Sequence, residues 1–218
     1  RRGDSRLALK VNDTLIEEYG DKRPDLIYET LGRNVELYRK LRDATGEQAA
    51  LEKLVKYFSE NTGKIAKDED TQAVFEKAKS YLRARATEVH KEAQKTKAPK
   101  LYSRAADLYE LYLRAFLAKP ETDKEQKEAT QIRVYRADAL IVAGREAESI
   151  RELDLAMRNS GDSKLRREAG GTLINLLIKR IDQTKAKGRD NSDAEKQFLD
   201  AAQAFEDRGC PIRAGHCA

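Results

Sequence analysis

The segment RADALIVAGREAESIRELDLAM, residues 136–157, places two helical patterns on either side of one glycine. The spacing i, i+3, i+4 gathers apolar side chains on one face of a helix. It occurs before the glycine at Ala137, Leu140 and Ile141, and after it at Ile150, Leu153, Ala156 and Met157. Gly144 can adopt the positive φ that ends a helix, and the connection is short. The segment therefore predicts two antiparallel helices joined by a tight turn.

Similar patterns continue along the chain and predict about eight or nine helices. In the first, residues 7–19, we expect the buried stripe to be Leu7, Val11, Leu15 and Tyr19. We expect an interruption at Gly170-Gly171 in the helix from Leu165 to about Lys187. Ser192 is predicted to cap the last helix, with Glu195 completing the capping box. No segment is rich in β-formers, so the chain is predicted to be all-α.

The expected hairpin turns lie near Gly46, Ala98, Gly144 and Gly188, a spacing of about 44 to 52 residues that is typical of helical solenoids. This spacing predicts a right-handed superhelical stack of antiparallel helix pairs, an α-solenoid. We expect a single helical-repeat domain over residues 1–208 and a cysteine-containing tail over 209–218.

The charge pattern argues for solvated helix surfaces. Charged residues make up 37% of the chain and its formal net charge is +5, but the two signs alternate along nearly every segment. Nucleic-acid binding is disfavoured, because no basic stripe with aromatic stacking platforms is present. The longest apolar run, LINLLI, is far shorter than a membrane helix requires, so no membrane span is expected.

The residues do not indicate catalysis or a cofactor. The two histidines are His90, expected on a charged helix surface, and His216 in the tail, and neither has a spacing that pairs it with a nucleophile. Gly170-Gly171 lacks the strand and the lysine of a phosphate loop. We expect neither an enzyme nor a bound cofactor.

Both cysteines lie in the tail segment CPIRAGHC. Pro211 and Gly215 would help a loop between Cys210 and Cys217 to close, so a disulfide is feasible in an oxidising compartment. Free or intermolecularly paired thiols are the alternative. A metal site with His216 would lack a fourth ligand in this segment, so no metal is expected.

The segments LYSRAADLYELYLRAFLAKPET and ATQIRVYRADALIVAGREAESIRELDLAM resemble tetratricopeptide repeats. The residues that match the family's small, large and glycine positions are Ala137, Leu140, Gly144, Ser149, Leu153 and Ala156. The chain departs from the family at Glu146, where an aromatic residue is usual, and at Ser149, where Ala is usual. The strict register covers about residues 130–158, and the other hairpins fit it loosely. A further resemblance is to periplasmic repeat proteins of Gram-negative cell envelopes.

The resemblance implies a scaffold whose concave groove accepts an extended peptide or a partner helix. The residues expected to face the groove are Gln131, Asp138, Asn175 and Lys179, with ordinary surface positions as the alternative. One subfamily clamps a partner's terminal carboxylate with an Asn where this chain has Asp138. Asp138 would repel a carboxylate, so that clamp is not expected.

Two functional hypotheses follow. The first is a noncatalytic protein-interaction scaffold in the periplasm or cell envelope of a bacterium, in an assembly for motility, secretion, division or wall maintenance. The alternative is a basic cytoplasmic helical-repeat protein that binds nucleic acid or a nucleoprotein.

Overall fold

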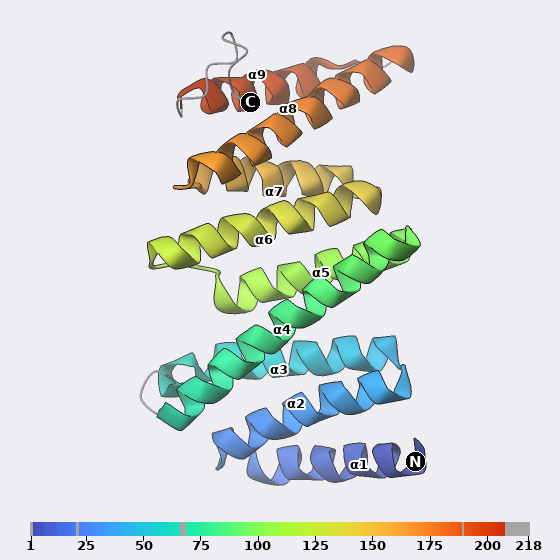
Figure 1. The fold of residues 1–218 in the computed structure, drawn as a ribbon, viewed down its shortest axis with the longest axis vertical. Helices are drawn as coiled ribbons and strands as arrows, with labels where there is room; N and C mark the ends of the chain where they lie inside the picture. The colour runs from blue at the N-terminus through green and yellow to red at the C-terminus, as the bar shows by residue number, and fades with distance from the viewer. Residues whose placement is uncertain (1, 21, 66–68, 189, 208–218) are drawn as a thin grey trace. The chain divides into compact units, whose positions relative to one another are not determined.

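A computed structural model describes residues 2–20, 22–65, 69–188 and 190–207, and within these ranges the chain forms nine α-helices and no strand (Figure 1). The helices are α1 (Arg2–Tyr19), α2 (Pro24–Leu41), α3 (Ala44–Ile65), α4 (Glu69–Thr96), α5 (Pro99–Phe116), α6 (Asp123–Val142), α7 (Glu146–Asn159), α8 (Ser163–Ala186) and α9 (Ser192–Asp207). The predicted all-α class is confirmed. None of the helices in these ranges is long and apolar enough to span a bilayer.

The chain divides into two compact units, Arg1–Arg85 (unit 1) and Ala86–Ala218 (unit 2). Within each unit, consecutive helices run in alternating directions (Figure 1) and pack against each other, as a solenoid of helix pairs requires. The prediction of one domain over residues 1–208, with a right-handed superhelical twist, stays a prediction.

The core of unit 1 lies between α2 and α3, where the apolar residues recur at helical spacing. The buried apolar residues of these two helices include Ile27, Leu31, Val35, Leu51, Leu54, Val55 and Phe58. Tyr28 joins them and stacks on Phe58, with their ring centroids 4.1 Å apart. Because a helix that packs on one side repeats its apolar residues at this spacing, each helix buries one face.

The predicted buried stripe of α1 is wrong. Leu7 and Val11 are 63% and 53% exposed, whereas Leu9 and Asn12 are buried. The Asn12 side-chain amide donates a hydrogen bond of 2.7 Å to the Asn34 side-chain oxygen on α2. In this rotation of α1, the polar Asn12–Asn34 pair is buried against α2 and satisfies both side chains, while Leu7 and Val11 face outward. Apolar periodicity alone does not reveal such a pair.

The α6–α7 hairpin of unit 2 has the geometry predicted around Gly144. Gly144 has φ +78°, its N–H donates to the Ile141 carbonyl, and the Arg145 N–H donates to the Leu140 carbonyl at 2.9 Å. These two bonds form a Schellman motif, which closes a helix with a left-handed residue. The hairpin packs on α8 and α9 through a shared core that contains Ala137, Leu153, Ala156, Met157, Leu173, Leu177 and Phe205.

Two expected interruptions between or within helices need correction. The turn expected near Gly46 lies just before it, where Arg42 adopts φ 59° and Asp43 donates its N–H to the Tyr38 carbonyl. Helix α8 continues through Gly170-Gly171, because a glycine inside a packed helix weakens it without ending it.

The capping box predicted at Ser192 is absent. The Ser192 hydroxyl donates to the Asp190 carboxylate, while Glu195 accepts from the Asn191 amide. A box with the same sequence signature forms instead at the start of α6, where the Thr122 side chain accepts from the Glu125 N–H and the Glu125 carboxylate accepts from the Thr122 N–H.

Candidate functional site

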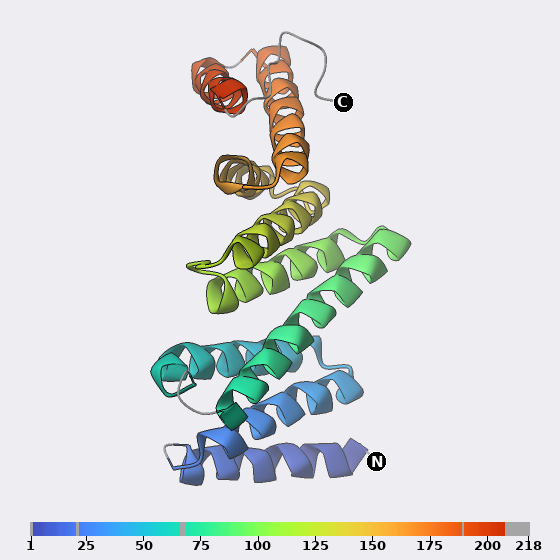
Figure 2. The same ribbon diagram turned by 60° about the vertical axis from the view of Figure 1, so that its left-hand side comes forward.

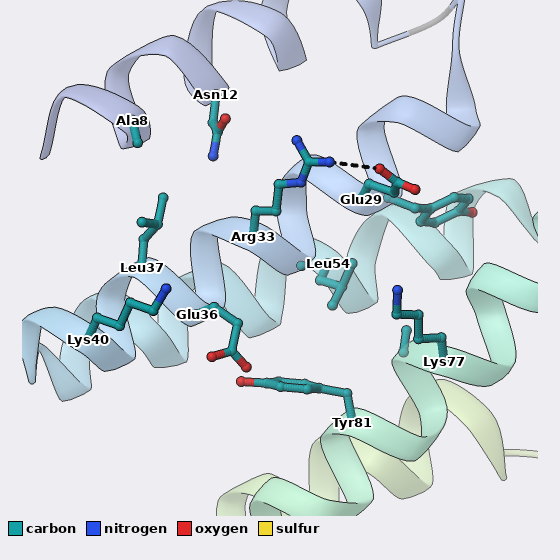
Figure 3. A pocket seen from close by; sticks show the side chains of 13 residues that line it. Ala8, Asn12, Glu29, Arg33, Glu36, Leu37, Lys40, Leu54, Lys77 and Tyr81 are labelled. Carbon is teal, nitrogen blue, oxygen red and sulfur yellow. Dashed lines mark hydrogen bonds and ion pairs between the residues drawn. The ribbon is translucent and has the colours of Figure 1, made fainter. Parts of the chain in front are cut away.

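A hollow of about 660 Å³ opens in unit 1 along helix α2 (Figure 3). Its apolar and aromatic lining comes from Ala8, Tyr28, Leu37, Leu54, Ala78 and Tyr81. Its polar lining comes from Asn12, Glu29, Arg33, Glu36, Lys40 and Lys77, and Gly32 completes it. Volumes of this order, with an apolar lining and a few polar groups, are typical of ligand sites in proteins. We call this hollow the α2 cavity.

Helix geometry explains how one short stretch of α2 supplies so much of the lining. Glu29, Arg33, Leu37 and Lys40 follow one another at intervals of three or four residues, so their side chains lie along one face. The first part of α4 supplies another wall through Lys77, Ala78 and Tyr81. An ion pair holds that wall in place: both carboxylate oxygens of the buried Glu47 accept from the Arg85 guanidinium, at 2.5 and 3.0 Å.

The charged residues of the α2 cavity differ in whether they are paired. The Glu29 carboxylate pairs with Arg33 at 3.1 Å, and the Glu36 carboxylate pairs with Arg39 at 3.8 Å. The Tyr81 hydroxyl points toward the Glu36 carboxylate (Figure 3). Burial, together with this carboxylate, raises the pKa of Tyr81. Lys40 and Lys77 have no ion-pair partner among the described residues, so the unpaired charge of the lining is positive.

The four predicted groove residues all belong to unit 2, and none of them lines the α2 cavity of unit 1. On α6, the Gln131 amide donates to the Tyr135 hydroxyl at 2.9 Å, and Asp138 is exposed. On α8, Asn175 and Lys179 are both exposed and one turn apart. Their role as a peptide-binding groove stays a prediction.

Asp138 has the most unusual environment of these four residues. Its side chain reaches solvent, yet the surrounding protein removes part of its hydration. This desolvation, with the nearby Glu168 as a second cause, raises the pKa of Asp138 to about 6.

A second hollow, of about 390 Å³, lies in unit 2 among α7, α8 and α9. In Figure 2, α7 and α9 lie on the same side of α8. Ile150, Leu173 and Leu177 contribute to its apolar lining. On α7, Arg158 bridges Asp154 and Asp200 at 2.7 Å each, and both carboxylates belong to the lining. The two carboxylates of this lining are therefore already paired with an arginine.

A network of arginines and carboxylates connects α5, α6 and α7, and sequence reasoning missed its burial. Arg136 is buried and donates to Glu152 and, at 2.8 Å, to Glu110. Arg133 donates to the same Glu152 at 2.7 Å. In the turn, Arg145 pairs with Glu148 on α7 and with Asp107 on α5. Alternating charges predicted exposed ion pairs, because the sequence does not show which of them face a neighbouring helix.

His90 was expected on a charged surface and is instead buried. Its ring packs edge-on against Tyr102 and Tyr109, and its Nδ1 lies 3.3 Å from the Tyr109 hydroxyl. Burial lowers the pKa of His90. Charged neighbours at 88, 91 and 92 suggested a surface position, but the apolar residues Ala86, Val89 and Ala93 place His90 on the opposite, buried face.

The predicted disulfide between Cys210 and Cys217, and His216 beside it, lie outside the described residues. Among the residues that the structure describes, no group of three or more His, Cys, Asp or Glu side chains could hold a metal ion.

No protein-family model, curated protein or solved structure matches this chain.

Proposed function

We propose that this chain is a noncatalytic interaction scaffold that holds a peptide segment of another protein, and that its helical hairpins are of the tetratricopeptide type. The α2 cavity carries this proposal. It combines apolar side chains, tyrosine rings and charges of both signs on one accessible face. A peptide has apolar side chains and polar groups in alternation, and such a mixed lining can contact both.

The α6–α7 hairpin supports the tetratricopeptide part of the proposal. Ala137, Ser149 and Ala156, at the small positions of the family pattern, are fully buried, and the large residues Leu140 and Leu153 are too. The Ser149 hydroxyl donates to the Ala137 carbonyl at 3.1 Å, which connects the two helices directly. Small residues at these positions allow two helices to approach closely, which is the packing reason for the family pattern.

Selection from a displayed library of random linear peptides tests the proposal. The purified chain is immobilised, peptides are selected over several rounds, and the enriched peptides are synthesised and their binding is measured by fluorescence anisotropy. We expect enrichment of a peptide class that binds with a Kd in the micromolar range. If no peptide is enriched, and duplex DNA or RNA instead binds with a strong salt dependence, the scaffold proposal is wrong and the nucleic-acid alternative replaces it.

A further inference from the structure

Gly32 lies within α2 and lines the α2 cavity, although the fold does not require glycine there. A Cβ atom at this position would meet no atom within 4 Å, and its φ does not lie in the left-handed region. Glycine inside a helix is destabilising relative to alanine. Because Gly32 has no side chain, it leaves open space above α2 inside the cavity, which a ligand group can enter.

Other helical glycines of the chain sharpen this comparison. At Gly46 and Gly170 a Cβ would lie 2.3 Å from the Tyr38 ring and 2.4 Å from the Phe205 ring, so packing accounts for both glycines. Gly171 on α8 resembles Gly32, since its Cβ would also meet nothing within 4 Å. Because it is outside the α2 cavity, Gly171 is a matched control for Gly32.

The charges around Gly32 indicate what kind of peptide fits. The carboxylates of Glu29 and Glu36 each have an arginine partner, whereas the ammonium groups of Lys40 on α2 and Lys77 on α4 have none among the described residues. The carboxylates of an acidic ligand could therefore pair with these two ammonium groups. A basic ligand would instead have to compete with Arg33 and Arg39 for the carboxylates of the cavity.

We infer that the α2 cavity binds an acidic peptide segment, with an apolar side chain of the peptide seated over Gly32 and its carboxylates near Lys40 and Lys77. This inference rests on the proposed scaffold function and adds the chemical class of the partner. A nucleic acid is also anionic, but its charged backbone would leave the apolar lining of the α2 cavity unused.

The experiment uses the peptides enriched from the random library and measures their Kd by fluorescence anisotropy against variants of the whole chain. Gly32→Leu fills the space over α2 and should weaken binding at least about tenfold, as expected when a hot-spot pocket is blocked. Gly171→Leu should leave the Kd within about twofold. Circular dichroism melts check that each variant folds, and Gly32→Ala, the smallest change at this site, supplies a second test if Gly32→Leu does not fold.

The charge reversals Lys40→Glu and Lys77→Glu, made together, should weaken binding by about tenfold at low salt and by less at 0.5 M NaCl, since screening reduces exposed electrostatic interactions (~3 Å Debye length near 1 M salt). Lys53→Glu, an exposed position on α3 outside the cavity, is the control. Enriched peptides that lack acidic residues, or that bind both glycine variants equally well, overturn this inference while the scaffold proposal stands. Failure to enrich any peptide overturns the scaffold proposal itself.

Discussion

Two adjacent glycines on α8 have opposite surroundings, so the same substitution should have opposite effects at each. A Cβ at Gly170 would lie 2.4 Å from the buried ring of Phe205 and 3.2 Å from the Met157 sulfur, whereas a Cβ at Gly171 meets nothing within 4 Å. Gly170→Ala should overpack the core of unit 2 and destabilise it by about 1–3 kcal/mol. Gly171→Ala should stabilise the helix by about 0.5–1 kcal/mol. Urea denaturation followed by circular dichroism measures both changes, and equal effects at the two positions would contradict this packing.

Asp138 gives a residue-scale prediction for the dependence of stability on pH. Its pKa is about 6 in the folded protein and near 3.9 in an unfolded chain. A raised folded pKa means that the folded protein holds the proton more tightly. The contribution of this group to stability is therefore complete below about pH 4 and is lost as the pH rises through about 6.

Because the ionised Asp138 carboxylate is unfavourable in the fold at neutral pH, Asp138→Asn should raise the Tm at pH 7.5. The difference should shrink toward zero as the pH approaches 4, where the aspartate is protonated. Glu168→Gln removes the second cause of the shift, so it should give a smaller change of the same sign. Differential scanning fluorimetry at both pH values makes the comparison. If Asp138→Asn changes the Tm by the same amount at pH 4 and at pH 7.5, the ionisation of Asp138 does not explain the effect and the prediction is wrong.

At the scale of the elements, the α6–α7 hairpin depends on the size of one alanine. Ala156 is fully buried in the core that α6, α7, α8 and α9 share. Ala156→Leu should therefore force its neighbours apart and cost about 1–3 kcal/mol. Ala147→Leu, at an exposed position on the same helix, should change the free energy of unfolding by less than about 0.5 kcal/mol. If Ala156→Leu is neutral in urea denaturation, the tetratricopeptide register proposed for this hairpin is wrong.

The elements also show how far sequence reasoning extends. Periodicity and helix-ending residues predicted the helices and most of the buried face of the α6–α7 hairpin, because a helix that packs on one side repeats its apolar residues at a fixed spacing. The face of α1 could not be predicted in this way. Its buried side includes Asn12, which bonds to Asn34 on α2, and apolar spacing along one helix does not reveal a contact between residues on different helices.

For the candidate site, the sequence predicted neither the place nor the chemistry of the α2 cavity. No sequence pattern distinguishes Gly32 from Gly171, because the space above a helical glycine depends on which elements pack around it. The sequence also does not show which charged residues of the α2 cavity are paired, because each side chain has several possible partners of opposite charge. The residues proposed from the family resemblance, Gln131, Asp138, Asn175 and Lys179, all belong to unit 2. Their role in binding, the disulfide of the tail and the cell-envelope location remain predictions.

At the scale of the whole molecule, the arginine network limits how the chain can be modified or can evolve. In an array of independent repeats, a hairpin can be duplicated, deleted or exchanged for a consensus unit. Here Arg145 in the α6–α7 turn reaches back to Asp107 on α5, and the buried Arg136 also binds Glu110 on α5. A transplanted α6–α7 hairpin would keep the buried Arg136–Glu152 pair but lose the pairs with Glu110 and Asp107, whose carboxylates are 49% and 45% exposed. Each lost pair should therefore cost about 1 kcal/mol or less. A recombination breakpoint between α5 and α6 would break both pairs, whereas a breakpoint outside α5–α7 would keep them.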